Sequence, residues 1–131
     1  MIAFDTTFLI DLLNNNQKAV RTFNEIVKDG ELFYTTEINV FELLVGAQVK
    51  KREKYTKTAM QMIEHIRILP LIRNASIKAA EICSQLILSG KEIGDTDCLI
   101  AGICLGNNCN KIITNNKKHF ERIKELEVIS Y

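Results

Sequence analysis

The fold is decided by the first thirteen residues, which read Met1-Ile-Ala-Phe-Asp-Thr-Thr-Phe-Leu-Ile-Asp-Leu-Leu13. Residues 2–4 are apolar without alternation, which predicts a strand that is buried on both faces of a parallel sheet. Such a strand has no obvious use for an acid, yet Asp5 stands at its end, where a helix begins. Open parallel sheets place their ligands at the carboxyl ends of strands, so Asp5 is a candidate site residue.

Length and composition restrict the class of protein. The 131 residues predict one domain over 1–131, which buries roughly two thirds of the unfolded surface without disulfides or a structural metal. A hydrophobic content of 47% and a net charge of +1 are ordinary for a globular protein, and this charge neither indicates nor excludes a nucleic-acid partner. No apolar run reaches the ~20 residues of a membrane helix, and Asp5 interrupts any signal segment, so we expect a cytoplasmic protein. The four cysteines form no C-x-x-C pair and are expected to be reduced core thiols.

Apolar strands and amphipathic helices alternate along the whole chain. Strands are predicted at 2–4, 32–35, 68–70, 111–114 and 127–130. Helices are predicted at 6–13, 17–28, 37–51, 58–66, 74–88, 97–105 and 117–123. Thr36 is placed to cap the third of these helices, because its hydroxyl can accept from the free N–H groups of the first turn. This order predicts a three-layer α/β/α sandwich with a central parallel sheet and right-handed crossovers.

Two further acids lie on apolar faces of helices. At about 100° per residue, Glu42 falls on the apolar stripe of the helix at 37–51, which we expect to be buried. This stripe consists of Ile38, Phe41, Val45 and Val49. Asp97 falls on the stripe of the helix at 97–105, which is apolar almost all round and is therefore expected at the centre of the fold. That second stripe contains Ile100, Ala101 and Cys104.

The three acids Asp5, Glu42 and Asp97 predict a metal site. A buried carboxylate without a partner costs several kcal/mol, and neighbouring carboxylates repel one another. A divalent ion removes both problems, and oxygen ligands select a hard ion such as Mg²⁺ or Mn²⁺. Such an ion can bind a phosphodiester and activate water, which is the chemistry of metal-dependent nucleases. The motifs of several other enzyme classes, including the Walker A loop, are absent.

Structural interpretations compete with the functional ones. Asp5 could be a helix N-cap, and Asp95 is expected to be an N-cap in preference to a ligand, since Gly94 precedes it and a helix follows. Asn116 fits an N-cap and a site role equally well. Asp11 is expected to be solvated or to support the site from behind, and His119, next to Phe120, is expected to be structural.

A basic stretch, Lys50-Lys51-Arg52-Glu53-Lys54 with Lys57, is expected to connect two helices. The favoured interpretation is a solvated surface, and the alternative is a contact with RNA.

Four segments together resemble the motifs of PIN-domain ribonucleases of the VapC type. They are residues 1–13, Val40-Phe-Glu-Leu-Leu-Val-Gly46, Ile93-Gly-Asp-Thr-Asp-Cys-Leu-Ile-Ala101 and Ile113-Thr-Asn-Asn-Lys-Lys-His-Phe120. Each segment is weak evidence alone, but all four occur in the family's order and span nearly the whole chain. The resemblance implies a PIN-like domain that is a Mg²⁺- or Mn²⁺-dependent endoribonuclease, a hydrolase. It also implies a homodimer that is inhibited by a VapB-like antitoxin whose segment lies across the active-site groove.

The resemblance also implies roles for particular residues. The metal ligands correspond to Asp5, Glu42 and Asp97. The hydroxyls close to the metal or substrate correspond to Thr6 or Thr7 and to Thr114.

One position departs from the family pattern, because many PIN domains have a fourth acid where this chain has Asn116. An amide can orient water but adds no charge, so we expect one tightly bound ion, with Asp95 as a possible source of compensating charge. Asn116 also keeps open a PIN-like module that binds RNA or a protein with little or no catalysis. A further alternative is an RNA-processing nuclease that has no antitoxin.

Overall fold

Five strands and seven helices alternate in the computed structural model, which describes residues 1–131. The strands are β1 (Ile2–Phe4), β2 (Phe33–Thr36), β3 (Arg67–Leu69), β4 (Lys111–Ile113) and β5 (Glu127–Ile129). The helices are α1 (Thr6–Leu13), α2 (Gln17–Lys28), α3 (Glu37–Val49), α4 (Glu53–Glu64), α5 (Arg73–Leu88), α6 (Asp95–Gly106) and α7 (Lys117–Phe120).

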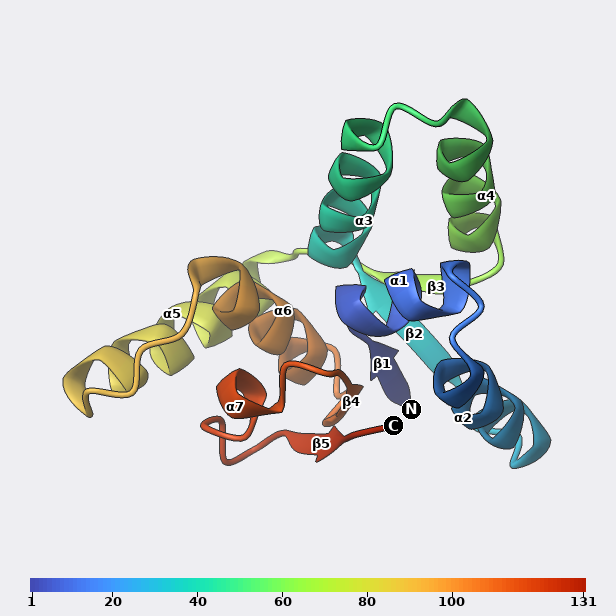
Figure 1. Ribbon diagram of the computed structural model, residues 1–131. Coiled ribbons are helices and arrows are strands. Elements are labelled where there is room, and N and C mark those ends of the chain that lie inside the picture. The colour runs from blue at the N-terminus through green and yellow to red at the C-terminus, as the bar shows by residue number, and fades with distance from the viewer.

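The strands form one parallel sheet in the order β3-β2-β1-β4-β5. The chain builds outward from β1 through β2 to β3, and then returns to the other side of β1 with β4 and β5 (Figure 1). The direction of building therefore reverses beside β1, and such a reversal is where open α/β sheets leave a crevice. Asp5 follows β1 directly, so it lies at this point.

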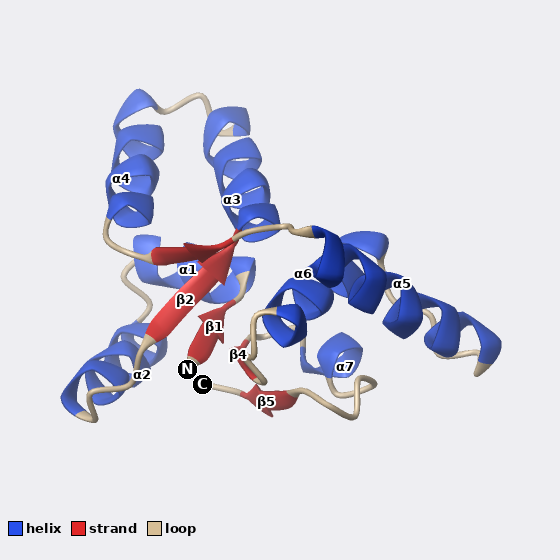
Figure 2. Cartoon of the chain, turned by 180° about the vertical axis from the view of Figure 1, so that it is seen from behind, coloured by secondary structure: helices blue, strands red, loops and turns tan.

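Helices cover both faces of the sheet, which confirms the predicted α/β/α sandwich. Ile2 and Phe4 belong to a core shared with α1, α2, α3 and α4, whereas Ala3 belongs to a second core shared with α5, α6 and α7. These three residues of β1 are at most 5% exposed, as the unbroken apolar run predicted. Figure 2 shows α3 and α4 as a pair of helices that extends beyond the edge of the sheet, on the opposite side from α5.

The expected burial of the α3 stripe is wrong. Phe41, Val45 and Val49 are 63%, 45% and 74% exposed. The buried face of α3 consists of Asn39, Leu43 and Ala47. Apolar residues occur on two sides of this helix, and periodicity alone does not say which side the rest of the chain covers.

Two helix starts also differ from prediction. Helix α4 begins at Glu53, so only residues 50–52 form the connection, and Lys54 and Lys57 lie on the helix. Helix α6 begins at Asp95 with Gly94 as its N-cap, which corrects the expectation that Asp95 would cap it. The four cysteines are free and three of them are buried, as expected. None of the helices is both long enough and apolar enough to cross a membrane.

Candidate active site

Asp5 is held rigidly at the end of β1, and it is only 4% exposed. Its Oδ2 accepts hydrogen bonds from the hydroxyls of Thr7 at 2.8 Å and Thr114 at 2.6 Å. Its Oδ1 accepts one from the Asn39 amide at 3.1 Å. Asp5 occupies the N-cap position of α1, but its side chain caps no backbone N–H group. Asp5 therefore stands at the N-cap position but does not cap the helix, because its oxygens accept hydrogen bonds from side chains of α1, of α3 and of the residue after β4.

Asn39 joins the start of α3 to this acid, and sequence reasoning missed it. The Thr36 hydroxyl accepts from the Asn39 backbone N–H at 3.2 Å and donates to its side-chain oxygen at 2.6 Å, which completes the predicted cap. The amide of Asn39 then donates both to Asp5 and, at 3.0 Å, to the Thr6 hydroxyl. The spacing Thr36-x-x-Asn39 is a signal of a capping box that could have identified it.

Glu42 lies one helical turn beyond Asn39 and faces the same place. Its Oε2 accepts a hydrogen bond from the Thr6 hydroxyl at 2.5 Å. Since Thr6 itself accepts from Asn39, a chain of hydrogen bonds runs from the cap of α3 to this carboxylate. Its other oxygen, Oε1, has no hydrogen-bond partner, and the side chain is only partly buried, so this oxygen remains available to a ligand.

Asp97, Asn116 and His119 form a second cluster across the cavity from Glu42. His119 Nδ1 lies 2.6 Å from Asp97 Oδ2, and the Asn116 amide lies 3.3 Å from the same oxygen. The Asn116 amide nitrogen also lies 2.9 Å from His119 Nδ1, so the three side chains contact one another. Asn116 is the N-cap residue of α7, but its side chain makes no capping hydrogen bond. His119 is thus part of the site, which corrects the expectation that it is purely structural.

One cavity of about 470 Å³ brings most of the predicted residues together. Its lining includes Asp5, Thr6, Thr7, Glu42, Asp97 and Asn116. Thr114 is completely buried behind it, where it donates to Asp5 and accepts from the backbone N–H of Asn116 at 2.8 Å. The side chains of Phe41 and Val45 form an apolar rim on the α3 side.

Two predicted acids lie outside this cavity. Asp95 is exposed and has only the Cys83 thiol, at 4.0 Å, as a neighbour. Asp11 accepts hydrogen bonds from the Tyr131 hydroxyl at 2.7 Å and the Asn115 amide at 2.9 Å. Asp11 therefore supports the fold behind the site, and Asp95 supplies no side-chain contact to it.

The donor set of the cavity fits a hard divalent cation. No lysine or arginine forms an ion pair with Asp5, Glu42 or Asp97, and the one basic side chain that contacts any of them is His119. No three acid, histidine or cysteine side chains are gathered closely enough to hold one ion directly. An ion in this cavity would therefore bond directly to one or two carboxylates and would keep water molecules as its other ligands, as Mg²⁺ often does in proteins.

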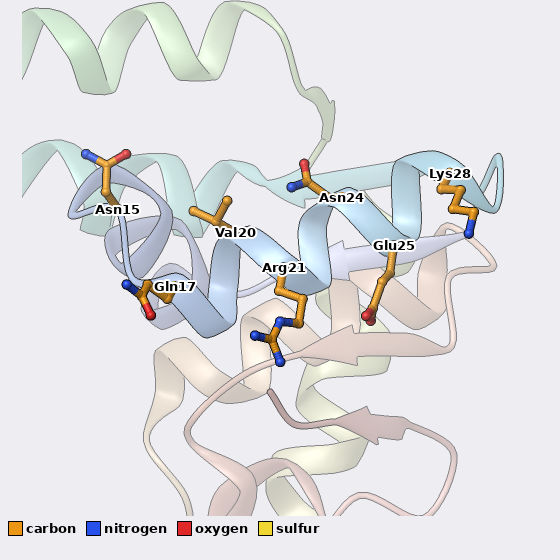
Figure 3. Close-up of a pocket in the computed structure, with 7 residues that line it drawn as sticks. All are labelled: Asn15, Gln17, Val20, Arg21, Asn24, Glu25 and Lys28. Carbon is orange, nitrogen blue, oxygen red and sulfur yellow. The ribbon is translucent and has the colours of Figure 1, made fainter.

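A larger hollow of about 620 Å³ lies along α2 and contains none of these acids (Figure 3). Arg21, Glu25 and Lys28 from one face of the helix line it, together with the single apolar residue Val20. Glu25 is its only acid, so it offers no cluster of carboxylates.

The fold and the site together define a class of protein: a parallel α/β/α domain that collects carboxylates at the switch point of its sheet. The family model described as "PIN domain" matches residues 2–126, so the chain belongs to the PIN domain family.

Within that family the chain is similar to VapC proteins, as the four motifs predicted. It is 33% identical over 101 residues to Ribonuclease VapC of Rickettsia bellii, and this match covers 74% of this chain and 75% of that protein. It is 23% identical over 123 residues to Ribonuclease VapC2 of Rickettsia felis, which covers 93% of this chain and 91% of the relative.

Solved structures share the fold over the full length. The crystal structure of VapBC2 from Rickettsia felis bound to a promoter DNA fragment has a TM-score of 0.88 at 22% identity, covering 100% of this chain and 99% of that one. The VapBC-1 structure from nontypeable Haemophilus influenzae has a TM-score of 0.85 at 26% identity, and the match covers 99% of this chain and 98% of that one.

Proposed function

We propose that this protein is a divalent-metal-dependent endoribonuclease that acts on cytoplasmic RNA as the toxin of a VapBC-type toxin–antitoxin pair. The observation that carries the proposal is the cavity in which Asp5, Glu42, Asp97 and Asn116 converge without a lysine or arginine partner. Similarity to proteins named Ribonuclease VapC supports the same activity.

Asp5, Glu42 and Asp97 would hold the ion, one or two of them directly and the rest through its bound water molecules. Asp97 Oδ1 and Glu42 Oε1 make no hydrogen bond in the structure, so both oxygens are available to a cation. A bound Mg²⁺ or Mn²⁺ would supply Lewis acidity that activates water and stabilises charge on the phosphate. Because Asn116 adds no negative charge to the cavity, we expect one ion to be held tightly.

The protein's own side chains supply orientation. Three donors fix both oxygens of Asp5, and Asn116 and His119 both contact Oδ2 of Asp97, so both carboxylates are oriented before substrate binds. The Asn116 amide lies beside Asp97 on the open side of this pair, where it can orient a water molecule by hydrogen bonding. This rigid arrangement matches in-line attack on a phosphodiester, which depends on positioning more than on covalent chemistry.

We further propose that the protein is a homodimer and is inhibited by a VapB-like antitoxin that covers the groove. The exposed side chains of Phe41 and Val45 support this proposal. They form an apolar rim beside the acids, and in the isolated chain this rim is exposed to solvent. The solved relatives with this fold include complexes titled VapBC.

The test is cleavage of a labelled structured RNA by purified protein in Mg²⁺, in Mn²⁺ and in EDTA. Asp97→Asn removes charge at the site and is expected to abolish cleavage, whereas Asp95→Asn, an exposed acid two residues away, is the matched control and should retain it. Cleavage that persists in EDTA or in Asp97→Asn would overturn the proposal. RNA binding without cleavage at any Mg²⁺ or Mn²⁺ concentration, in protein free of antitoxin, would instead indicate a PIN-like binding module.

A further inference from the structure

A second hollow lies at the other end of α1 and α3 from the acidic cavity. It has a volume of about 490 Å³. Its lining consists of Leu13, Asn14, Asn15, Lys50, Arg52 and Tyr55. The connection between α3 and α4 supplies its two cations, and the end of α1 supplies the two amides. We call it the basic hollow.

The cations around the basic hollow have no acidic partners. Five of the eight residues 50–57 are lysine or arginine, and Glu53 is the single acid among them. None of these five cations forms an ion pair, although cations elsewhere in the chain, such as Lys78 and Lys117, do. Like charges gathered without counter-charges repel one another, and an anionic ligand would relieve that repulsion.

Contacts among its lining residues hold the basic hollow in shape. The Lys50 ammonium group lies 4.0 Å from the centre of the Tyr55 ring, which is a favourable cation–π geometry. The Tyr55 hydroxyl donates to Asn14 Oδ1 at 3.3 Å and so joins the first turn of α4 to the end of α1. The cations are therefore presented at a defined place and not on a loose tail.

An open path along α3 joins the basic hollow to the acidic cavity. Glu42, Gly46 and Lys50 follow at four-residue intervals, so they form one row that runs about 12 Å along the helix axis. A Cβ atom placed on Gly46 would meet nothing within 4 Å, so the surface between the two charged groups is unobstructed. A few nucleotides of single-stranded RNA can span this distance.

We propose that the basic hollow binds backbone phosphates of the RNA strand whose scissile bond lies in the acidic cavity. This inference rests on the proposed function, since it needs RNA in the cavity. RNA is favoured over an acidic peptide because the hollow combines cations with amides and an aromatic ring beside an open path, which suits phosphates and unstacked bases. Lys50 and Arg52 are the residues that contact phosphate.

The experiment compares two double variants that lose the same charge. Lys50→Gln with Arg52→Gln removes the cations of the basic hollow, and Lys54→Gln with Lys57→Gln removes two cations of α4 that do not line it. Binding of a fluorescent 12-nucleotide single-stranded RNA is measured by anisotropy in EDTA at several salt concentrations, with melting temperatures to verify folding. An oligoglutamate peptide of equal charge is titrated as a competitor.

Loss of the two contacts should weaken RNA binding at low salt and reduce the slope of log affinity against log salt by about 1.4, or about 0.7 for each phosphate. The matched control should change this slope much less. The conservative variant Lys50→Arg, which keeps both positive charges, should show the same slope as the unchanged protein.

Three outcomes would overturn the inference: equal losses in both double variants, no loss in the first, or displacement of RNA by the peptide at equal concentration. Absence of RNA binding by the unchanged protein would overturn it as well. Because binding is measured without metal, the two failures can be told apart. A protein that binds RNA through Lys50 and Arg52 but never cleaves it would remove the proposed function, and only the binding of phosphates by the basic hollow would remain of this inference.

Discussion

Single residues set the geometry of the acidic cavity, and Asn39 shows how. It is completely buried, and its side chain contacts Thr36, Asp5 and Thr6 at once. A buried amide of this kind stabilises the fold only if its partners stay paired. The same side chain therefore contributes to the free energy of folding and to the orientation of an acid.

Asn39→Leu tests this double role. The substitution keeps the branched shape of the side chain but leaves the Asp5 carboxylate and the Thr36 hydroxyl with fewer buried partners, so we expect a loss of about 3 kcal/mol in the free energy of unfolding. Urea denaturation measures it. Asn24→Leu, on the exposed side of α2, is the control and should stay within about 0.5 kcal/mol of the unchanged protein. A loss in Asn39→Leu no greater than in this control would contradict the role.

The contact of His119 with Asp97 leads us to infer that His119 acts through Asp97 as a positioning residue. Removing its hydrogen bond with His119→Ala frees the Asp97 carboxylate to rotate, so we expect RNA cleavage to fall by about 10- to 100-fold, with weaker Mn²⁺ binding. Cleavage rates and Mn²⁺ titration measure the two effects. His65→Ala, at the exposed end of α4, should change neither. If Mn²⁺ affinity stays the same while cleavage falls, the positioning role is wrong.

At the scale of elements, α5 and α6 approach each other closely at Gly102. A Cβ atom on Gly102 would lie 2.5 Å from the Ala79 side chain and 2.7 Å from the Ala75 carbonyl oxygen. Small residues therefore let the two helices meet backbone to backbone. Helix α6 carries Asp97 in its first turn, so this contact fixes the height of the acid relative to the sheet.

Gly102→Ala and Gly46→Ala form a matched pair of helix substitutions. The added methyl group at Gly102 must displace backbone, so we expect a loss of about 2 kcal/mol in the free energy of unfolding. At Gly46 the methyl group meets open space, and alanine should stabilise the helix by about 0.5–1 kcal/mol. Urea denaturation of both variants gives the comparison. Equal effects in the two would show that helix propensity, and not packing, controls the difference.

At the scale of the whole molecule, Tyr131 closes the fold against α1. Its hydroxyl donates to Asp11, and its ring packs edge-on against Phe8 with 4.8 Å between ring centres. Burial, followed by the hydrogen bond to the Asp11 carboxylate, raises the pKa of Tyr131 above its ordinary value of 10.0. The folded protein therefore retains the phenol proton more strongly than the unfolded chain does.

The sign of the pH dependence follows. A group whose pKa is raised in the folded state contributes stability that is fully present below the unfolded pKa, and it loses this contribution as pH rises above it. We expect the free energy of unfolding to fall as pH rises above about 10, and the Tyr131-specific part of this fall to vanish in Tyr131→Phe. Below that pH the variant should be less stable by about 1 kcal/mol, the net value of one hydrogen bond. Denaturation curves from pH 8 to pH 11 give the difference, with Tyr34→Phe as the control; a Tyr131→Phe curve parallel to that of the unchanged protein would contradict this account.

The order of elements could be read from the chain because its signals are local. The unbroken apolar run at residues 2–4, the cap at Thr36 and the breaks around Gly30 and Gly90 depend on neighbours in sequence. The strands and helices occur in the predicted order, and the starts of α4 and α6 are the clearest differences in position. Asp5 was singled out by its place at the end of a strand, and Glu42 and Asp97 by their places on apolar stripes of helices. For Glu42 that reasoning was only partly right, because the stripe is exposed and the carboxylate is partly buried.

Tertiary structure alone decided which surfaces and partners meet. The apolar stripe at Phe41, Val45 and Val49 and the buried face at Leu43 share one helix, and only the packing of α1 and α4 selects the face that is covered. The contact between His119 and Asp97 joins residues 22 positions apart through the turn after β4. No local pattern encodes such a contact, because its distance is set by how the sheet and α6 pack together.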